Sequence, residues 1–355
     1  MTGATVMRPV VAVLGALLVV ASTATSAGAD APRPTDYRSS VTEVAPALPA
    51  GAEVRIVGGD SLIELSLPRG HTAEIADYPG SDADEAAPYL RFDPDGTVRR
   101  NVHAVATTAN EARYGSTDRV PDPDARPRWE TVATDGSYAW HDHRVHWMSP
   151  TTPRVVDDDG RVDLGGPNGT WSVPLVVDGT PTVIEGELVL LPSPSVLPAV
   201  VLALLAVAVT VGVGLRWGLR AGAALGGATA TAATVVAIAT WRAVPAGAGA
   251  SVIPVVVAAV AALGGLVGAV GPRRFRLVAV TATAAALLGW AFTRGTVLTR
   301  AVLPTTLEPA VDRGVTAAAI GVGLGLAVLL VAAPSPKRSR EASSPTASPT
   351  ASPTA

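Results

Sequence analysis

The sequence predicts a multi-domain membrane protein in which an exported all-β sandwich precedes an α-helical bundle of five transmembrane helices. In the first half, short runs alternate apolar and polar residues and are separated by turn residues. Five apolar runs, each near the ~20 residues that cross a bilayer, follow Val196. The charge is also divided: the segment from Asp30 to Leu191 carries 27 acidic and 14 basic residues, and the rest of the chain carries 3 and 13.

The N-terminus has the pattern of a secretory signal peptide. Arg8 precedes the apolar run VVAVLGALLVVAS, and small residues then lead to Ala27-Gly28-Ala29, which forms an A-x-A cleavage site. We therefore expect a signal peptide over residues 1–29, cleaved after Ala29 or, as an alternative site, after Ala31. An uncleaved anchor helix is the competing interpretation, but the apolar run is short for a membrane span.

Residues 30–193 are predicted to form an extracytoplasmic β-sandwich domain. The run SLIELSL alternates with period two, which is typical of a half-buried strand. The runs TWSVPLVV and TVIEGELVLL alternate on either side of Asp178-Gly179, which predicts a β-hairpin. PYLRFDPDGTVRRN repeats this pattern around Asp95-Gly96. We expect no amphipathic helix here, and a looser stretch over 105–128.

Residues 194–333 are predicted to form the transmembrane domain. The five predicted helices cover 196–215, 221–241, 252–271, 277–293 and 314–333. An ionisable residue inside a span would mark an ion or proton pathway, and none lies in the middle of these runs. GxxxG spacings, which allow close helix packing but also arise by chance in Ala/Gly-rich helices, occur at Gly222/Gly226, Gly264/Gly268 and Gly321/Gly325. The helices therefore indicate an anchor or an interaction module rather than a transporter.

Export of the β-domain sets the expected topology, because the first helix then runs inward. The cytoplasmic helix ends hold eight basic residues: Arg216, Arg220, Arg273, Arg274, Arg276, Lys337, Arg338 and Arg340. The outer loops hold four: Arg242, Arg294, Arg300 and Arg313. This excess agrees with the positive-inside rule. We expect a multi-pass plasma-membrane protein with a disordered cytoplasmic tail at 334–355, whose SPTA repeat cannot form a core.

The composition restricts the chemistry. The chain has no cysteine, which excludes disulfides, thiolate metal sites and a cysteine nucleophile. The acidic half offers no basic surface for nucleic acid, and the chain has no HExxH, G-x-S-x-G or P-loop motif. We therefore expect a non-enzymatic protein whose partners are the lipid bilayer and an envelope or membrane protein.

The segment YAWHDHRVHWM, residues 138–148, contains three of the five histidines. In a strand, His141 and His143 would point to the same face and could share a Zn²⁺ or Cu²⁺ ion, since both ions accept neutral imidazole. The chain offers several candidates for a third ligand: His71, His103, Met148, and His146 if a bulge near Arg144 turns it inward. Strand geometry otherwise places His146 on the opposite face.

Two other interpretations of this segment compete with a metal site. In the first, the histidines line an exposed strand face, Asp142 and Arg144 form a salt bridge, and Trp140 and Trp147 anchor the core or dock an envelope partner. In the second, the histidines hold the metal of a hydrolase. The sequence favours copper or zinc binding through His141 and His143, with the docking protein as the alternative and the hydrolase third.

The order of these segments resembles that of uncharacterised polytopic membrane proteins of high-GC Gram-positive bacteria, in which an exported β-domain with a W-H-D-H-R-x-H-W segment, here residues 140–147, precedes about five helices. The layout is also distantly similar to that of bacterial copper-resistance proteins, which join a His/Met-bearing periplasmic β-sandwich to a membrane domain. This similarity implies copper as the ion. The chain departs from those proteins because the mature domain begins near Asp30 rather than at a ligating histidine, and because it has fewer helices.

Overall fold

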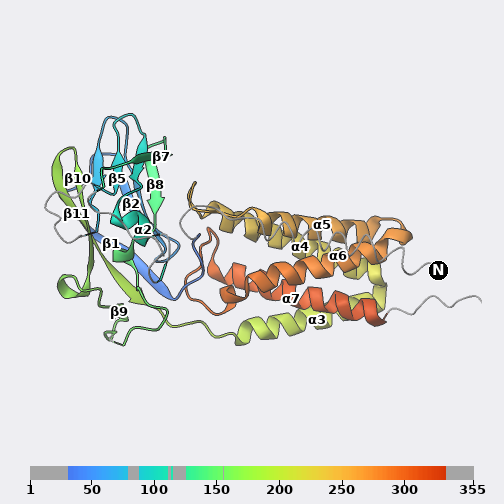
Figure 1. The fold of residues 1–355 in the computed structure, drawn as a ribbon. Coiled ribbons are helices and arrows are strands. Elements are labelled where there is room, and N and C mark those ends of the chain that lie inside the picture. The colour runs from blue at the N-terminus through green and yellow to red at the C-terminus, as the bar shows by residue number, and fades with distance from the viewer. Residues whose placement is uncertain (1–30, 79–87, 111–112, 115–124, 155, 333–355) are drawn as a thin grey trace, which may run out of the picture.

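The structure, a computed structural model, describes residues 31–78, 88–110, 113–114, 125–154 and 156–332. An antiparallel β-domain is followed by five long helices (Figure 1). This confirms the predicted fold class. The predicted signal peptide and the predicted cytoplasmic tail lie outside the described residues.

The strands of the β-domain form two antiparallel sheets. The larger sheet has the order β1-β11-β10-β4-β5-β6-β7, with β9 also paired to β11, and the smaller has the order β2-β3-β8. The larger sheet contains β1 (Tyr37–Ala45), β4 (Ala73–Ile75), β5 (Leu90–Phe92), β6 (Val98–Asn101), β7 (Trp129–Ala133), β9 (Arg161–Val162), β10 (Trp171–Val177) and β11 (Thr180–Leu190). The smaller contains β2 (Glu53–Val57), β3 (Leu62–Ser66) and β8 (Ser137–Trp140). Side chains from both sheets share one buried core, including Leu65, Phe92, Trp140 and Trp171.

Both predicted hairpins are present. β10 pairs with β11 from Trp171↔Gly186 to Val177↔Thr180, and the turn residues Asp178 and Gly179 have φ values of 48° and 78°. Positive φ at both positions is what a two-residue type I′ turn requires, and Asp-Gly adopts it at low cost. β5 and β6 also pair antiparallel around Asp95-Gly96, but of these two residues only Gly96 has a positive φ (87°), so this turn is not type I′.

β3 is buried on both faces, although its sequence alternates. Ile63 and Leu65 point into the shared core, as predicted. On the other face, Glu64 is also buried, where it pairs with Arg55 and contacts Ser137. β3 is the central strand of its sheet, so neighbouring strands supply partners for its polar side chain.

One short helix lies within residues 105–128, where the sequence predicted a looser stretch without a helix. α2 spans Val105–Ala109, and the Asp77 carboxylate accepts hydrogen bonds from the backbone N–H groups of Val105 (2.8 Å) and Ala106 (2.7 Å). Five residues are too few for a periodic pattern, and the acceptor comes from a distant part of the chain. No local pattern in the sequence therefore predicts this helix.

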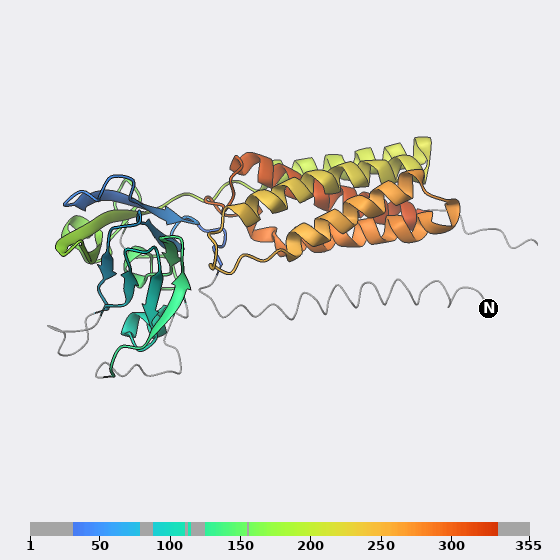
Figure 2. The same ribbon diagram turned by 90° about the horizontal axis from the view of Figure 1, so that it is seen from above.

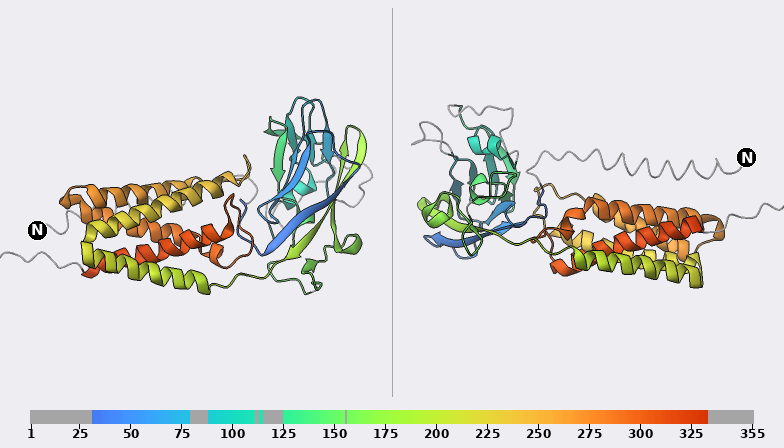
Figure 3. Two further views of the ribbon diagram at one scale, coloured as in Figure 1. Left: turned by 180° about the vertical axis from the view of Figure 1, so that it is seen from behind. Right: turned by 90° about the horizontal axis from the view of Figure 1, so that it is seen from below.

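The five long helices agree with the predicted spans. They are α3 (Leu197–Trp217), α4 (Leu219–Arg242), α5 (Ile253–Val270), α6 (Arg273–Thr293) and α7 (Pro309–Ala332). Each is long and apolar enough to cross a membrane, which supports a multi-pass membrane protein. Figure 3 shows α3 lying along α7 at one side of the bundle.

Glycines of the predicted GxxxG spacings lie at helix contacts inside the bundle. A Cβ on Gly226 would come within 2.8 Å of Leu326, and one on Gly268 within 2.8 Å of Ala223. A Cβ on Gly325 would come within 2.6 Å of Thr210. At Gly268 and Gly325 the obstacle is the Cβ atom of the neighbouring helix, so that helix approaches too closely for a side chain, whereas at Gly226 it is the flexible end of Leu326.

The β-domain contacts the end of the bundle where α3 begins (Figure 2). Thr35 and Val302 exchange two backbone hydrogen bonds of 3.0 and 2.8 Å. The Asp36 carboxylate accepts hydrogen bonds from Arg300 Nη1 (2.6 Å) and from the Ala301 N–H (2.8 Å). The segment before β1 is therefore joined to the connection between α6 and α7.

Candidate metal centre

The histidine segment is a strand that ends in a turn. β8 stops at Trp140, and a 3₁₀ turn, η1, covers His143–Val145. The prediction of a continuous strand was wrong, because the Asp142 side chain accepts a hydrogen bond from the Arg144 N–H (3.0 Å) and starts the turn. The turn brings His146 back to the side of His141.

The imidazoles of His141, His143 and His146 converge. Each offers a ligand atom, and these atoms all lie within 4.8 Å of one another. The Nε2 atoms of His141 and His146 are 2.9 Å apart. The His143 ring stands edge-on to both, with centroid distances of 5.2 and 5.4 Å. His141 and His146 are buried and His143 is half-buried, so His143 is the most accessible of the three.

Backbone carbonyl groups fix the orientation of the two buried rings. His141 Nδ1 lies 2.9 Å from the Ser61 oxygen, and His146 Nδ1 lies 3.0 Å from the Trp147 oxygen. A carbonyl oxygen only accepts, so each Nδ1 carries the proton and each neutral ring presents an Nε2 lone pair. Two unprotonated Nε2 atoms 2.9 Å apart repel each other, and a cation bound beside both atoms would remove that repulsion.

The surroundings keep both buried rings neutral. Burial lowers the pKa of His141 to about 4. Burial, together with the neighbouring His141, lowers the pKa of His146 to about 2. Arg113 lowers both pKa values further through its positive charge. Neutral imidazole is the form that ligates metals, so both rings have the correct protonation state at neutral pH.

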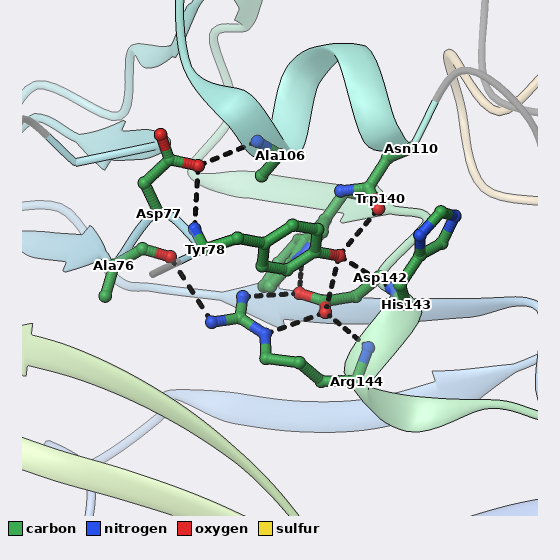
Figure 4. A network of polar contacts seen from close by, with 9 residues as sticks. All are labelled: Ala76, Asp77, Tyr78, Ala106, Asn110, Trp140, Asp142, His143 and Arg144. Atoms are coloured by element: carbon green, nitrogen blue, oxygen red, sulfur yellow. Dashed lines mark hydrogen bonds and ion pairs between the residues drawn. The ribbon is translucent and has the colours of Figure 1, made fainter. Parts of the chain in front are cut away.

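Asp142 is the centre of a buried polar network beneath the turn (Figure 4). Its carboxylate accepts hydrogen bonds from Trp140 Nε1 (2.9 Å), Arg144 Nε (2.8 Å) and Arg144 Nη2 (2.7 Å). Burial opposes ionisation of this carboxyl, but the Arg144 charge and these hydrogen bonds outweigh it and lower its pKa to about 2. The Asp142–Arg144 ion pair that the sequence suggested is therefore present, but it is buried rather than on an exposed strand face.

Tyr78 connects this network to the histidines. Its hydroxyl accepts a hydrogen bond from the His143 N–H (2.7 Å) and lies within hydrogen-bond distance of Asn110 Oδ1 (2.7 Å) and Asp142 Oδ1 (3.1 Å). The Arg144 guanidinium lies over the Tyr78 ring. Sequence reasoning missed Tyr78, Asn110 and Ser61, because no local pattern links residues 30 to 80 positions away to this turn.

The other predicted ligands lie apart from the three converging imidazoles. His103 Nδ1 bonds the Arg126 carbonyl oxygen (2.9 Å), and His71 Nδ1 bonds Asp178 Oδ2 (2.7 Å). Neither belongs to the group of ligand atoms that includes His141. The Met148 side chain is 40% exposed. Trp140 is a buried core residue, as the interpretation without a metal expected for both tryptophans, whereas Trp147 is half-buried and donates from Nε1 to the Thr151 carbonyl oxygen.

The chain was also compared with known proteins. It matches no protein-family model, no curated protein and no solved structure.

Proposed function

We propose that this membrane protein binds a transition-metal ion through His141, His143 and His146. The observation that carries the proposal is the 2.9 Å distance between the Nε2 atoms of His141 and His146, while the Nδ1 atom of each ring lies within hydrogen-bond distance of a backbone carbonyl oxygen. In metal sites, a ligating histidine usually donates its other ring N–H to a carbonyl or carboxylate, which is the arrangement of both buried rings here.

Copper is the ion we favour, and zinc is the second candidate. Three imidazoles without a thiolate suit both, and nitrogen ligands bind Cu²⁺ more tightly than Zn²⁺. Three protein ligands also leave a position open for a further ligand. The distant similarity in layout to copper-resistance proteins also favours copper.

We further propose that the β-domain lies outside the cell. The far end of the bundle, which is the end away from the β-domain, then faces the cytoplasm. It carries basic residues such as Arg216, Arg220, Arg273 and Arg274. Three arginines at the near end have structural partners: Arg294 pairs with Asp312, Arg300 pairs with Asp36, and Arg313 donates to backbone carbonyl groups. These arginines still count as basic residues of the outer side, so the bias remains eight basic residues against four.

The burial of this segment favours a metal site over a docking strand. Trp140, His141 and His146 are each at most 3% exposed, so a protein partner could not reach them without opening the domain. Of the flanking apolar residues, Met148 is exposed and Trp147 is half-buried.

Metal titration of the full-length protein in detergent tests the proposal. Calorimetry with Cu²⁺ and Zn²⁺ should show one site per chain in the wild type and none of comparable affinity in the His141→Ala/His146→Ala variant. The matched control is His103→Ala, which removes a histidine of the same domain outside the cluster. Identical weak isotherms for all three proteins would refute the metal site.

A further inference from the structure

A cavity of about 600 Å³ lies on the β-domain, at the side where Arg300 of the α6–α7 connection reaches its lining. Its walls come from the segment before β1, the turn before β3, the Arg113-Tyr114 pair, the loop around Ser149 and the α6–α7 connection at Arg300. Its size is that of a small-molecule site. His141 forms part of its wall, so the cavity borders the candidate metal centre without being part of it.

The charge of this cavity is opposite to that of its domain. The β-domain is strongly acidic, yet the residues lining the cavity include three arginines, Arg33, Arg113 and Arg300, and one acidic residue, Asp36. Asp60, which is not part of the lining, pairs with Arg113. Clefts lined by one sign of charge concentrate ligands of the other sign.

Two of these arginines are held in place by buried carboxylates. Arg113 donates from Nη2 to Asp60 and from Nε to the Tyr114 hydroxyl, and Arg300 donates from Nη1 to Asp36. A guanidinium has five N–H donors, so each of these arginines can also donate into the cavity. Hydroxyl groups of Tyr37, Ser61, Ser149 and Thr152 belong to residues of the same lining.

We propose that this cavity binds a phosphate group, either of a soluble phosphate monoester or of an anionic phospholipid head group. Guanidinium groups bind phosphate through parallel charge-assisted hydrogen bonds, and several of them favour a doubly charged anion. The cavity lies at the end of the membrane-spanning helices, where lipid head groups are found, and it is also large enough for a soluble monoester. This proposal does not rest on the metal centre.

Two arms of one experiment test the phosphate site and separate the sources, using metal-free full-length protein. In the first arm, glycerol 3-phosphate is titrated into protein in a phosphate-free detergent. In the second, thermal stability is compared in nanodiscs of phosphatidylcholine with and without phosphatidylglycerol. Arg33→Gln removes an exposed cavity arginine, and Arg113→Gln/Asp60→Asn removes a buried ion pair without leaving either charge alone. Arg38→Gln, an exposed arginine of β1 outside the lining, is the matched control.

We expect wild-type protein either to bind glycerol 3-phosphate or to be more stable in nanodiscs that contain phosphatidylglycerol. Both cavity variants should lower the affinity for glycerol 3-phosphate about tenfold or more, or lose most of the stabilisation by phosphatidylglycerol. A response to glycerol 3-phosphate assigns a soluble ligand, and a response to phosphatidylglycerol alone assigns a lipid head group. Absence of a response in both arms overturns the proposal. An equal loss in Arg38→Gln also overturns it, because the effect would then be one of general surface charge. Metal binding is not measured in either arm, so these outcomes are independent of the metal site.

Discussion

His141 and His146 are five positions apart in the sequence, and their Nε2 atoms lie 2.9 Å apart. A continuous strand would point them to opposite faces of the sheet. The η1 turn places them together and leaves His143 half-buried beside them. This relationship changes the rank of the three histidines as ligands, since the strand interpretation made His146 the least important.

We predict that His146→Ala weakens Cu²⁺ and Zn²⁺ binding as strongly as His141→Ala does. Each substitution removes a ligand, and loss of a residue that only orients a ligand already costs about 10–100-fold in affinity. The measurement is calorimetry of full-length variants, with His71→Ala as the control. If His146→Ala bound metal like the wild type while His141→Ala did not, the turn would not form the site described.

The two buried histidines should resist protonation in the metal-free protein. Their pKa values are lowered to about 4 for His141 and about 2 for His146, against about 6.5 for an unperturbed histidine. NMR of histidine-labelled protein, with resonances assigned by single substitutions, should show neither ring titrating between pH 8 and pH 5. A midpoint near pH 6.5 for either ring would contradict the buried arrangement.

The same shifts predict how stability depends on pH. Below pH 6.5 the unfolded chain binds protons at these histidines and the folded chain does not, so stability falls as the pH is lowered from about 6.5 to about 4. Each histidine contributes up to about 1.4 kcal/mol per pH unit in this range. Hydrogen exchange of residues 137–146, corrected for its intrinsic pH dependence, measures the effect. A His141→Gln/His146→Gln variant should show a flatter pH profile.

Asp142→Ala should destabilise the β-domain strongly. The substitution leaves Arg144 without its carboxylate and removes the acceptor of Trp140 Nε1. Breaking a buried ion pair from one side costs about 3–5 kcal/mol. Chemical unfolding measures this loss, and Asp158→Ala, at an exposed position, is the control. Asp142→Ala/Arg144→Met should recover part of the stability, whereas equal losses in the single and double variants would show that the ion pair is not the cause.

A second buried ion pair lies inside the helical bundle. Arg294 Nη2 donates to both carboxylate oxygens of Asp312 at 2.7 Å, and both side chains are at most 9% exposed. Asp312→Ala should lower the melting temperature in detergent by several degrees, because it leaves a buried cation without a partner. Glu308→Ala, an exposed acidic residue of the same connection, should have little effect. A melting temperature of Asp312→Ala equal to that of wild type would show that the pair does not stabilise the bundle.

The topology can be tested with reporters. With the β-domain outside and five spans, the C-terminus lies in the cytoplasm, because the basic residues at the end of the bundle away from the β-domain keep that end inside the cell. A reporter that works only in the cytoplasm should therefore be active when it is fused after Ala355, and a reporter that works only outside the cell should be inactive there. A second fusion within the connection between α4 and α5 should show the opposite response. A tail reporter active only outside the cell would overturn the five-span orientation.

The sequence by itself determined the features that depend on neighbouring residues. A membrane requires about 20 apolar residues in each span, so the five helices were predicted close to their observed bounds. Asp178-Gly179 specified its hairpin because few residues adopt positive φ at both turn positions. The histidine cluster could also be recognised as a candidate metal site from its composition alone.

Only the tertiary structure decided how the side chains of the site converge. His146 joins His141 because Asp142 starts a turn, and Asp142 is held by Tyr78, 64 residues earlier. Likewise, Arg294 was assigned to an outer loop, yet it pairs inside the bundle with Asp312. These relationships depend on buried polar groups that need partners, and a partner far along the chain leaves no local pattern in the sequence.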